Sequence, residues 1–159
     1  MRSVRIAAAV FNAPLGNTYE NLKRMEHWTA AARAEGAAIV CFPELNVTGY
    51  GVDERMRAAA EPIPGAVTER LSEMAQRQAV VILAGMAERA ADGRVFASHL
   101  VVSPVGVSGV YRKLHIAPPE EALFAAGDRA ELFEAAGVRF GIQLCYDAHF
   151  PGLSTRMAV

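Results

Sequence analysis

Three short apolar runs, separated by two segments of helical periodicity, constrain this chain to a fold of mixed helix and sheet. Residues 4–11, 38–42 and 80–86 are too short for typical helices and have the length of buried strands. The intervening segments 17–35 and 68–78 repeat apolar residues at helical spacing. Because strands that alternate with helices usually pair in one sheet, this half of the chain predicts an α/β architecture.

Local signals define the ends of the first helix. Asn17 is expected to cap it with Glu20 reaching back, and Gly36 is expected to end it. The residues expected on the inner faces of the two helices are apolar or small: Leu22, Met25, Thr29 and Ala32, then Leu71, Met74 and Ala75.

The second half of the chain has a different pattern. Residues 95–102 and 107–111 are strand-like and are joined by a short turn that contains proline and glycine, which predicts a β-hairpin. A long loop is expected over 117–128, and two further strands over 130–133 and 138–144. With hairpins added to strand–helix units, the sheet should be of mixed direction. No repeat or linker divides the chain, so it predicts one domain or part of one.

Composition excludes several classes of function. The chain has 159 residues, 52% of them hydrophobic, 21% charged, and a net charge of −1, which gives no electrostatic basis for binding nucleic acid or an anionic membrane. No apolar run has the length of a bilayer span, and no segment predicts a metal site or a glycine-rich phosphate loop. We therefore expect a cytoplasmic protein with reduced thiols and no cofactor or metal.

Three reactive side chains follow apolar runs at comparable positions: Glu44, Lys113 and Cys145. A thiolate is the reactive form of cysteine, and a nearby ammonium favours it and can stabilise an oxyanion. A carboxylate can accept the thiol proton, return it to a leaving amine and activate water. Together the three groups suffice for amide hydrolysis through a covalent intermediate.

The sequences around these residues resemble the nitrilase-like carbon–nitrogen hydrolases. The glutamate segment is Phe-Pro-Glu-Leu at 42–45 with Thr-Gly-Tyr at 48–50. The lysine segment is Tyr-Arg-Lys-Leu-His at 111–115, and the cysteine segment is Gly-Ile-Gln-Leu-Cys-Tyr-Asp at 141–147 with Phe-Pro at 150–151. The three motifs occur in the family's order and cover nearly the whole chain.

The resemblance implies a role for each of these residues. Glu44 would be the general base, Lys113 the stabiliser of the tetrahedral intermediate, and Cys145 the nucleophile. Glu121 would be the second glutamate that positions substrate and catalytic groups, with Glu120 as the competing choice.

The resemblance also implies a fold and partners. Residues 1–159 would form the N-terminal part of a four-layer αββα sandwich and would lack the family's C-terminal part. Tyr50 and Tyr146 would contact a small-molecule amide substrate. The chain would form a homo-oligomer, at least a dimer.

The Cys-Tyr-Asp sequence is more similar to amidase and carbamoyl-amide members than to true nitrilases. The expected substrate is therefore a linear amide or an N-carbamoyl amine. Ala97 and Gly152 depart from the residues that the family commonly carries at these positions. Gly152 and the early C-terminus favour an alternative, namely a degenerate or truncated relative that acts through binding or assembly.

The remaining candidates have structural interpretations. Cys41, which ends an apolar run, is expected to be a small buried apolar side chain. His149 lies too close in sequence to Cys145 for the usual cysteine–histidine dyad, and His115 is expected to order the loop after Lys113. Asp147 either lines the pocket or supports the turn at Cys145.

Overall fold

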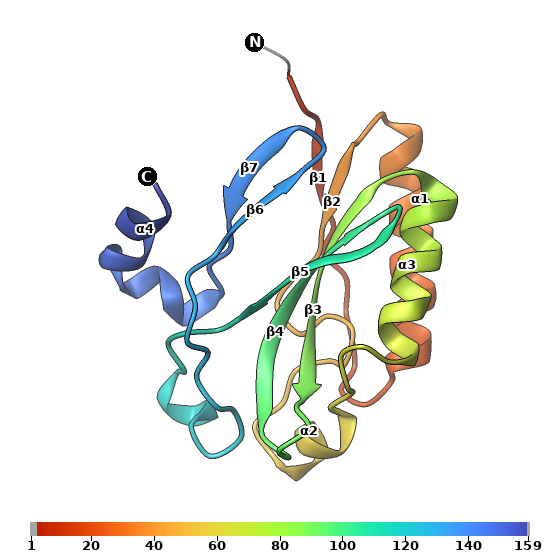
Figure 1. Cartoon of the computed structure of the whole chain (residues 1–159). Coiled ribbons are helices and arrows are strands. Elements are labelled where there is room, and N and C mark those ends of the chain that lie inside the picture. Colours follow the sequence, from red (N-terminus) through yellow and green to blue (C-terminus); the bar gives the residue numbers. More distant parts are fainter. Residues whose placement is uncertain (1–2, 159) are drawn as a thin grey trace.

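A mixed five-stranded sheet forms the centre of the computed structural model, which describes residues 3–158 (Figure 1). The strand order follows the sequence, with β1–β2–β3 parallel and β3–β4–β5 antiparallel. The strands are β1 (Ile6–Ala8), β2 (Ile39–Cys41), β3 (Val81–Arg89), β4 (Val95–Ser103) and β5 (Gly106–Arg112). This arrangement confirms the mixed α/β sheet and the predicted hairpin.

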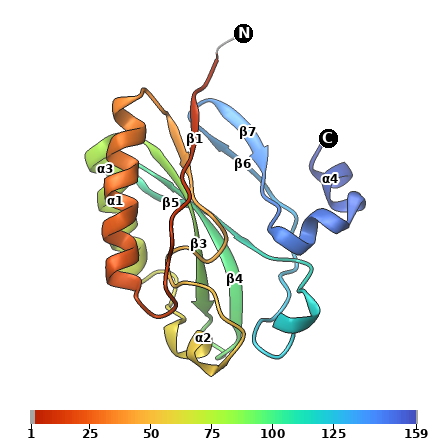
Figure 2. The same ribbon diagram turned by 180° about the vertical axis from the view of Figure 1, so that it is seen from behind.

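Two helices, α1 (Thr18–Ala34) and α3 (Ala66–Gln78), cover one face of the sheet (Figures 1 and 2). They meet a buried apolar cluster to which β2, β3 and β4 contribute Val40, Ile82 and Leu100. Alternate strand residues point to this face because successive side chains of a strand lie on opposite sides of a sheet.

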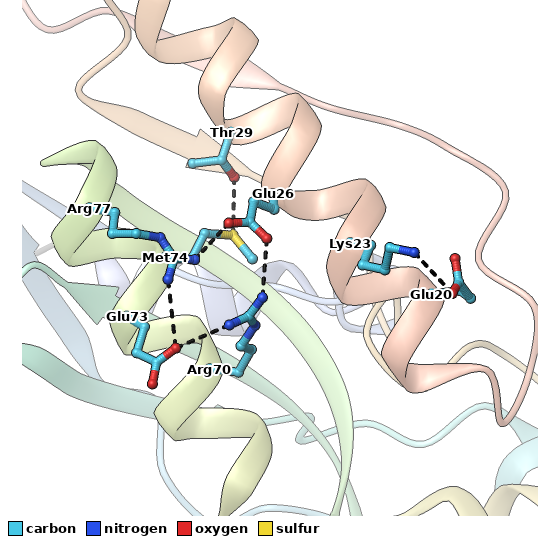
Figure 3. A network of polar contacts seen from close by, with 8 residues as sticks. All are labelled: Glu20, Lys23, Glu26, Thr29, Arg70, Glu73, Met74 and Arg77. Carbon is cyan, nitrogen blue, oxygen red and sulfur yellow. Dashed lines mark hydrogen bonds and ion pairs between the residues drawn. The ribbon is translucent and has the colours of Figure 1, made fainter.

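Polar contacts fix how the two helices lie against each other (Figure 3). Glu26 on α1 pairs with Arg77 at 2.7 Å and with Arg70 at 3.3 Å, both on α3. Beneath this exposed pairing, the hydroxyl of Thr29 donates to the sulfur of Met74 at 3.5 Å in the buried interface. Surface ion pairs of this kind contribute only about 0–1 kcal/mol each, so apolar burial supplies most of the stability.

The opposite face of the sheet is partly covered by a second, two-stranded sheet of β6 (Leu132–Ala135) and β7 (Val138–Gly141). Phe133, Ile142 and Leu144 from this region form a cluster with Leu83 and Val101 of the main sheet. The chain then enters the 3₁₀ turn η2 (Cys145–His149) and helix α4 (Pro151–Met157), on the side of the sheet away from α1 and α3 (Figure 2).

Several local predictions differ from the structure. The strand expected over 138–144 ends at Gly141, and the first strand covers only Ile6–Ala8. Asn17 precedes α1 but makes no side-chain capping bond. The side chain of Asn21 is buried instead, and its amide donates to the backbone carbonyls of Pro14 and Val47.

Two short elements complete the fold. Helix α2 (Glu54–Ala59) is capped by Asp53, whose carboxylate accepts from the backbone N–H of Arg55, and the 3₁₀ turn η1 (Pro118–Glu120) interrupts the predicted loop. Among the residues that the structure describes, no helix is long and apolar enough to cross a membrane.

Candidate active site

The segment that carries Glu44 is held against β3 beyond the end of β2. Asn46 Oδ1 accepts from the backbone N–H of Gly85, and Thr48 Oγ1 accepts from that of Ala87, both at 3.0 Å. A Cβ atom at position 85 would lie 2.4 Å from the backbone nitrogen of Leu45. Only glycine therefore lets the Glu44 segment lie this close to the sheet.

Lys113 follows β5 directly and is fixed at both its backbone and its side chain. Its backbone N–H donates to Ala97 at 2.9 Å, which extends the pairing of β5 with β4. The side chain is fully buried, and its Nζ lies 2.8 Å from Glu120 Oε2 and 2.9 Å from Glu44 Oε1. The lysine is thus held between two carboxylates.

These contacts determine the charge of the lysine. Burial alone would lower the pKa of Lys113, but the hydrogen bond to Glu120 and the charges of the Glu120 and Glu44 carboxylates outweigh it, so the pKa is raised. The ammonium therefore stays charged at neutral pH. Two of its three N–H groups suffice for the two carboxylates, which leaves one donor for another oxygen.

For the carboxyl group of Glu44, in contrast, burial has a larger effect on the pKa than the neighbouring charges do. Desolvation raises its pKa, and the neighbouring Lys113 only partly offsets this effect. Although Lys113 Nζ is close enough for an ion pair, Oε1 of Glu44 is buried and has no hydrogen-bond partner among the described residues. Glu44 is therefore a carboxylate with spare acceptor capacity and an enhanced tendency to take a proton.

The family resemblance favoured Glu121 over Glu120 as the second glutamate, but the structure places Glu120 against Lys113. Glu120 ends the η1 turn with its side chain directed inward and only 5% exposed, whereas Glu121 is exposed. The backbone carbonyl of Glu120 also accepts from Leu123 and Phe124, which anchors the turn. The geometry of this 3₁₀ turn, which the sequence pattern did not predict, selects position 120.

Cys145 begins η2 rather than closing a strand. Its φ of 44° lies in the left-handed region, which is uncommon for a residue with a side chain and typically costs about 1–3 kcal/mol. The residue is exposed, and together with Glu44 it lines a cavity of about 340 Å³. Strained residues of this kind cluster at functional sites, where surrounding contacts hold them in place.

The buried carboxylate of Asp147 links the cysteine turn to the lysine segment. Its Oδ2 accepts from Tyr111 at 2.8 Å and from the backbone N–H of Leu144 at 3.1 Å. Its Oδ1 accepts from the backbone N–H of His115 at 2.9 Å and lies 2.9 Å from the Nδ1 of the same residue. Asp147 therefore supports the turn at Cys145, the second of the two roles left open by the sequence.

The remaining candidate residues surround this core. Tyr50 is 55% exposed, and desolvation together with the Glu120 carboxylate raises its pKa. Tyr146 is half-buried and contacts the rings of His149 and Phe150. His115 stacks on Phe150 with 3.7 Å between the ring centroids. Substrate contacts by the two tyrosines stay predictions.

Cys41 is half-buried at the end of β2 and lines the same cavity as Cys145. Burial raises the pKa of its thiol. The two cysteines therefore differ in exposure, and Cys145 is the more accessible.

The chain belongs to the carbon–nitrogen hydrolase family, whose model matches residues 5–159. It is 32% identical over 143 residues to an (R)-stereoselective amidase of a Pseudomonas species, an alignment that covers 90% of this chain and 52% of the amidase. It is 33% identical over 161 residues to a nitrilase of Pyrococcus abyssi, covering 98% of this chain and 61% of the nitrilase. The chain thus spans only part of the length of these relatives.

Solved structures show the same fold. Nit3 of Saccharomyces cerevisiae, a member of branch 10 of the nitrilase superfamily, matches with a TM-score of 0.87 at 20% identity, covering 98% of this chain and 60% of Nit3. An amidase from Nesterenkonia sp. matches with a TM-score of 0.83 at 21% identity, covering 94% of this chain and 58% of the amidase. The nitrilase-like fold inferred from the motifs is therefore confirmed.

One further residue of the cavity wall was not singled out by the sequence. His99 lies on β4, lines the cavity with Glu44 and Cys145, and is only 4% exposed. The available signal was a histidine inside the apolar run of a central strand, where a polar ring needs a partner.

Proposed function

We propose that this chain hydrolyses a non-peptide carbon–nitrogen bond through a thioester on Cys145. The arrangement that supports this function best is the buried Lys113 between Glu44 and Glu120, with Glu44 and Cys145 on one cavity wall. The sequence identity to an amidase and a nitrilase supports the same class of reaction.

In the proposed first half-reaction, Glu44 accepts the thiol proton as the sulfur of Cys145 attacks the carbonyl carbon of an amide. The carbonyl oxygen becomes an oxyanion, and the free N–H of Lys113 stabilises it. Collapse of the tetrahedral intermediate breaks the carbon–nitrogen bond. Glu44 returns its proton to the leaving nitrogen, which departs as ammonia or an amine.

In the second half-reaction, Glu44 deprotonates a water molecule that attacks the thioester. The second tetrahedral intermediate expels the thiolate of Cys145, which recovers the proton from Glu44, and the carboxylic acid leaves. Glu120 holds the ammonium of Lys113 in place through both steps, and we assign to it the role of the second glutamate.

The substrate class we propose is a linear amide or an N-carbamoyl amine. It rests on the Cys-Tyr-Asp sequence at 145–147 and agrees with the name of the Pseudomonas relative. For a carbamoyl substrate the products would be ammonia, carbon dioxide and an amine. The alternative of an inert relative has less support, because Glu44, Lys113 and Cys145 are all present, with the first two in contact.

The test is ammonia release from a panel of short aliphatic amides and N-carbamoyl amines by wild type, Cys145→Ala and Cys145→Ser. Cys41→Ala is the matched control, because Cys41 lines the same cavity. We expect both Cys145 variants to lose turnover and the Cys41 variant to keep it. Turnover that survives in Cys145→Ala would refute the covalent mechanism.

A further inference from the structure

His99 lies at the middle of strand β4 and lines the cavity of the candidate site. In the register of β4 it lies opposite Gly85 of β3 and Tyr111 of β5. Gly85 is the residue over which the Glu44 segment crosses, and Tyr111 is the residue that binds Asp147. His99 is therefore flanked by the two residues that position the glutamate and cysteine segments.

The imidazole of His99 is buried without a complete set of hydrogen bonds. The residue is 4% exposed, and its Nδ1 has no hydrogen-bond partner among the described residues. Burial lowers its pKa to about 4, so the ring is uncharged at neutral pH. Buried polar atoms are rarely left without a partner in folded proteins, and each exception calls for an explanation.

The cavity lined by Glu44 and Cys145 also has His99 in its wall. Its wall combines the reactive Glu44 and Cys145 with mostly apolar side chains, among them Leu83, Phe140 and Ile142. Binding pockets commonly have this composition, with an apolar lining and a few polar groups that set orientation and specificity. In this wall the neutral ring of His99 can both donate and accept a hydrogen bond.

We propose that His99 determines substrate specificity by hydrogen-bonding an uncharged polar substituent on the acyl part of the substrate. This inference rests on the proposed function, since the acyl group would occupy the cavity next to Cys145. An apolar chain would leave the ring without a partner. A carboxylate would meet a neutral imidazole rather than a cation, so a hydroxyl or amide substituent should be preferred over a charged one.

The proposal is tested with amides of increasing length, each offered as a methyl-terminated chain, as its hydroxyl-terminated isostere and as the corresponding carboxylate. For the length that reaches His99, wild type should prefer the hydroxyl over the methyl compound by roughly tenfold in kcat/KM, the usual scale of one hydrogen bond. His99→Leu should reduce this preference to near unity. His99→Asn and His99→Gln, which retain a polar group, should keep part of it.

Binding to Cys145→Ala supplies a measurement that does not depend on turnover. Its affinities for the same amides should show the same preference for the hydroxyl, which the double variant Cys145→Ala/His99→Leu should lose. An identical hydroxyl-to-methyl ratio with and without His99, at every length, would overturn the proposal. Persistent hydrolysis by Cys145→Ala would instead refute the proposed function, so the two failures are distinguishable.

Discussion

Asp147 Oδ2 lies 2.8 Å from the phenolic oxygen of Tyr111, and this buried contact ties the cysteine turn to the end of strand β5, which Lys113 follows. The same carboxylate accepts from the backbone N–H groups of Leu144 and His115. One side chain thus fixes the relative position of two segments 32 to 36 residues apart in sequence, a separation that no local preference could bridge.

The Asp147 contact predicts a large loss of stability on truncation. Asp147→Ala would leave the buried phenol of Tyr111 and the buried N–H of Leu144 without partners, at about 1–3 kcal/mol each, and would also free the part-buried N–H of His115. We expect the free energy of unfolding in urea to fall by roughly 3 kcal/mol or more. The exposed Asp92, which pairs with Arg94 on the surface, is the matched control, and Asp92→Ala should change little. Equal stability of the two variants would contradict the role assigned to Asp147.

The two adjacent glutamates predict opposite outcomes for the same substitution. Glu120→Gln removes the charge that holds Lys113 and should lower kcat/KM at least about a hundredfold. Glu121→Gln alters an exposed side chain and should leave kcat/KM unchanged. Steady-state kinetics on one amide decide the matter, and a larger effect at position 121 would restore the choice made from sequence.

The raised pKa of Glu44 predicts the acid side of the pH profile. Because Glu44 must be ionised to act as a base, activity should rise with pH as its carboxyl group loses a proton. Desolvation places that midpoint above the ordinary value of 4.5 for a glutamate. The measurement is kcat/KM against pH below neutrality. A midpoint at or below 4.5 would contradict this account of the site.

The buried His99 predicts a pH-dependent stability. Its pKa is about 4 in the folded chain against 6.5 without burial, so the unfolded chain binds more protons between these values. The contribution of the neutral ring to the free energy of unfolding is fully present above pH 6.5 and is lost as the pH falls through 4. The loss should reach roughly 3 kcal/mol.

Urea unfolding at several pH values between 7 and 4 measures this dependence. His99→Leu should flatten it, whereas substitution of the exposed His27 to glutamine should not. If wild type and His99→Leu lose stability in parallel, the imidazole is not buried as described.

Much of the fold and site could be predicted from the sequence. Helical periodicity placed α1 and α3, and the motifs around Glu44, Lys113 and Cys145 indicated the family that the chain belongs to. These features depend on local patterns or on residue type at fixed spacing, both of which a single sequence contains.

The sequence could not predict details that depend on tertiary contacts. Glu120 and Glu121 are adjacent carboxylates, and only the geometry of the η1 turn separates them. The role of His99 depends on the register of β4 with its neighbours and on the cavity that forms above it. A cytoplasmic location, self-association and the absence of nucleic-acid or membrane partners stay predictions.

The measurement that tests the central claim most directly is the mass of the Cys145 peptide after rapid acid quenching of wild type with an amide substrate. The mechanism predicts an added mass on that peptide equal to the acyl group less the thiol hydrogen it replaces, and none on the Cys41 peptide. Rapid turnover with an unmodified Cys145 peptide, or an adduct elsewhere, would contradict the proposed thioester.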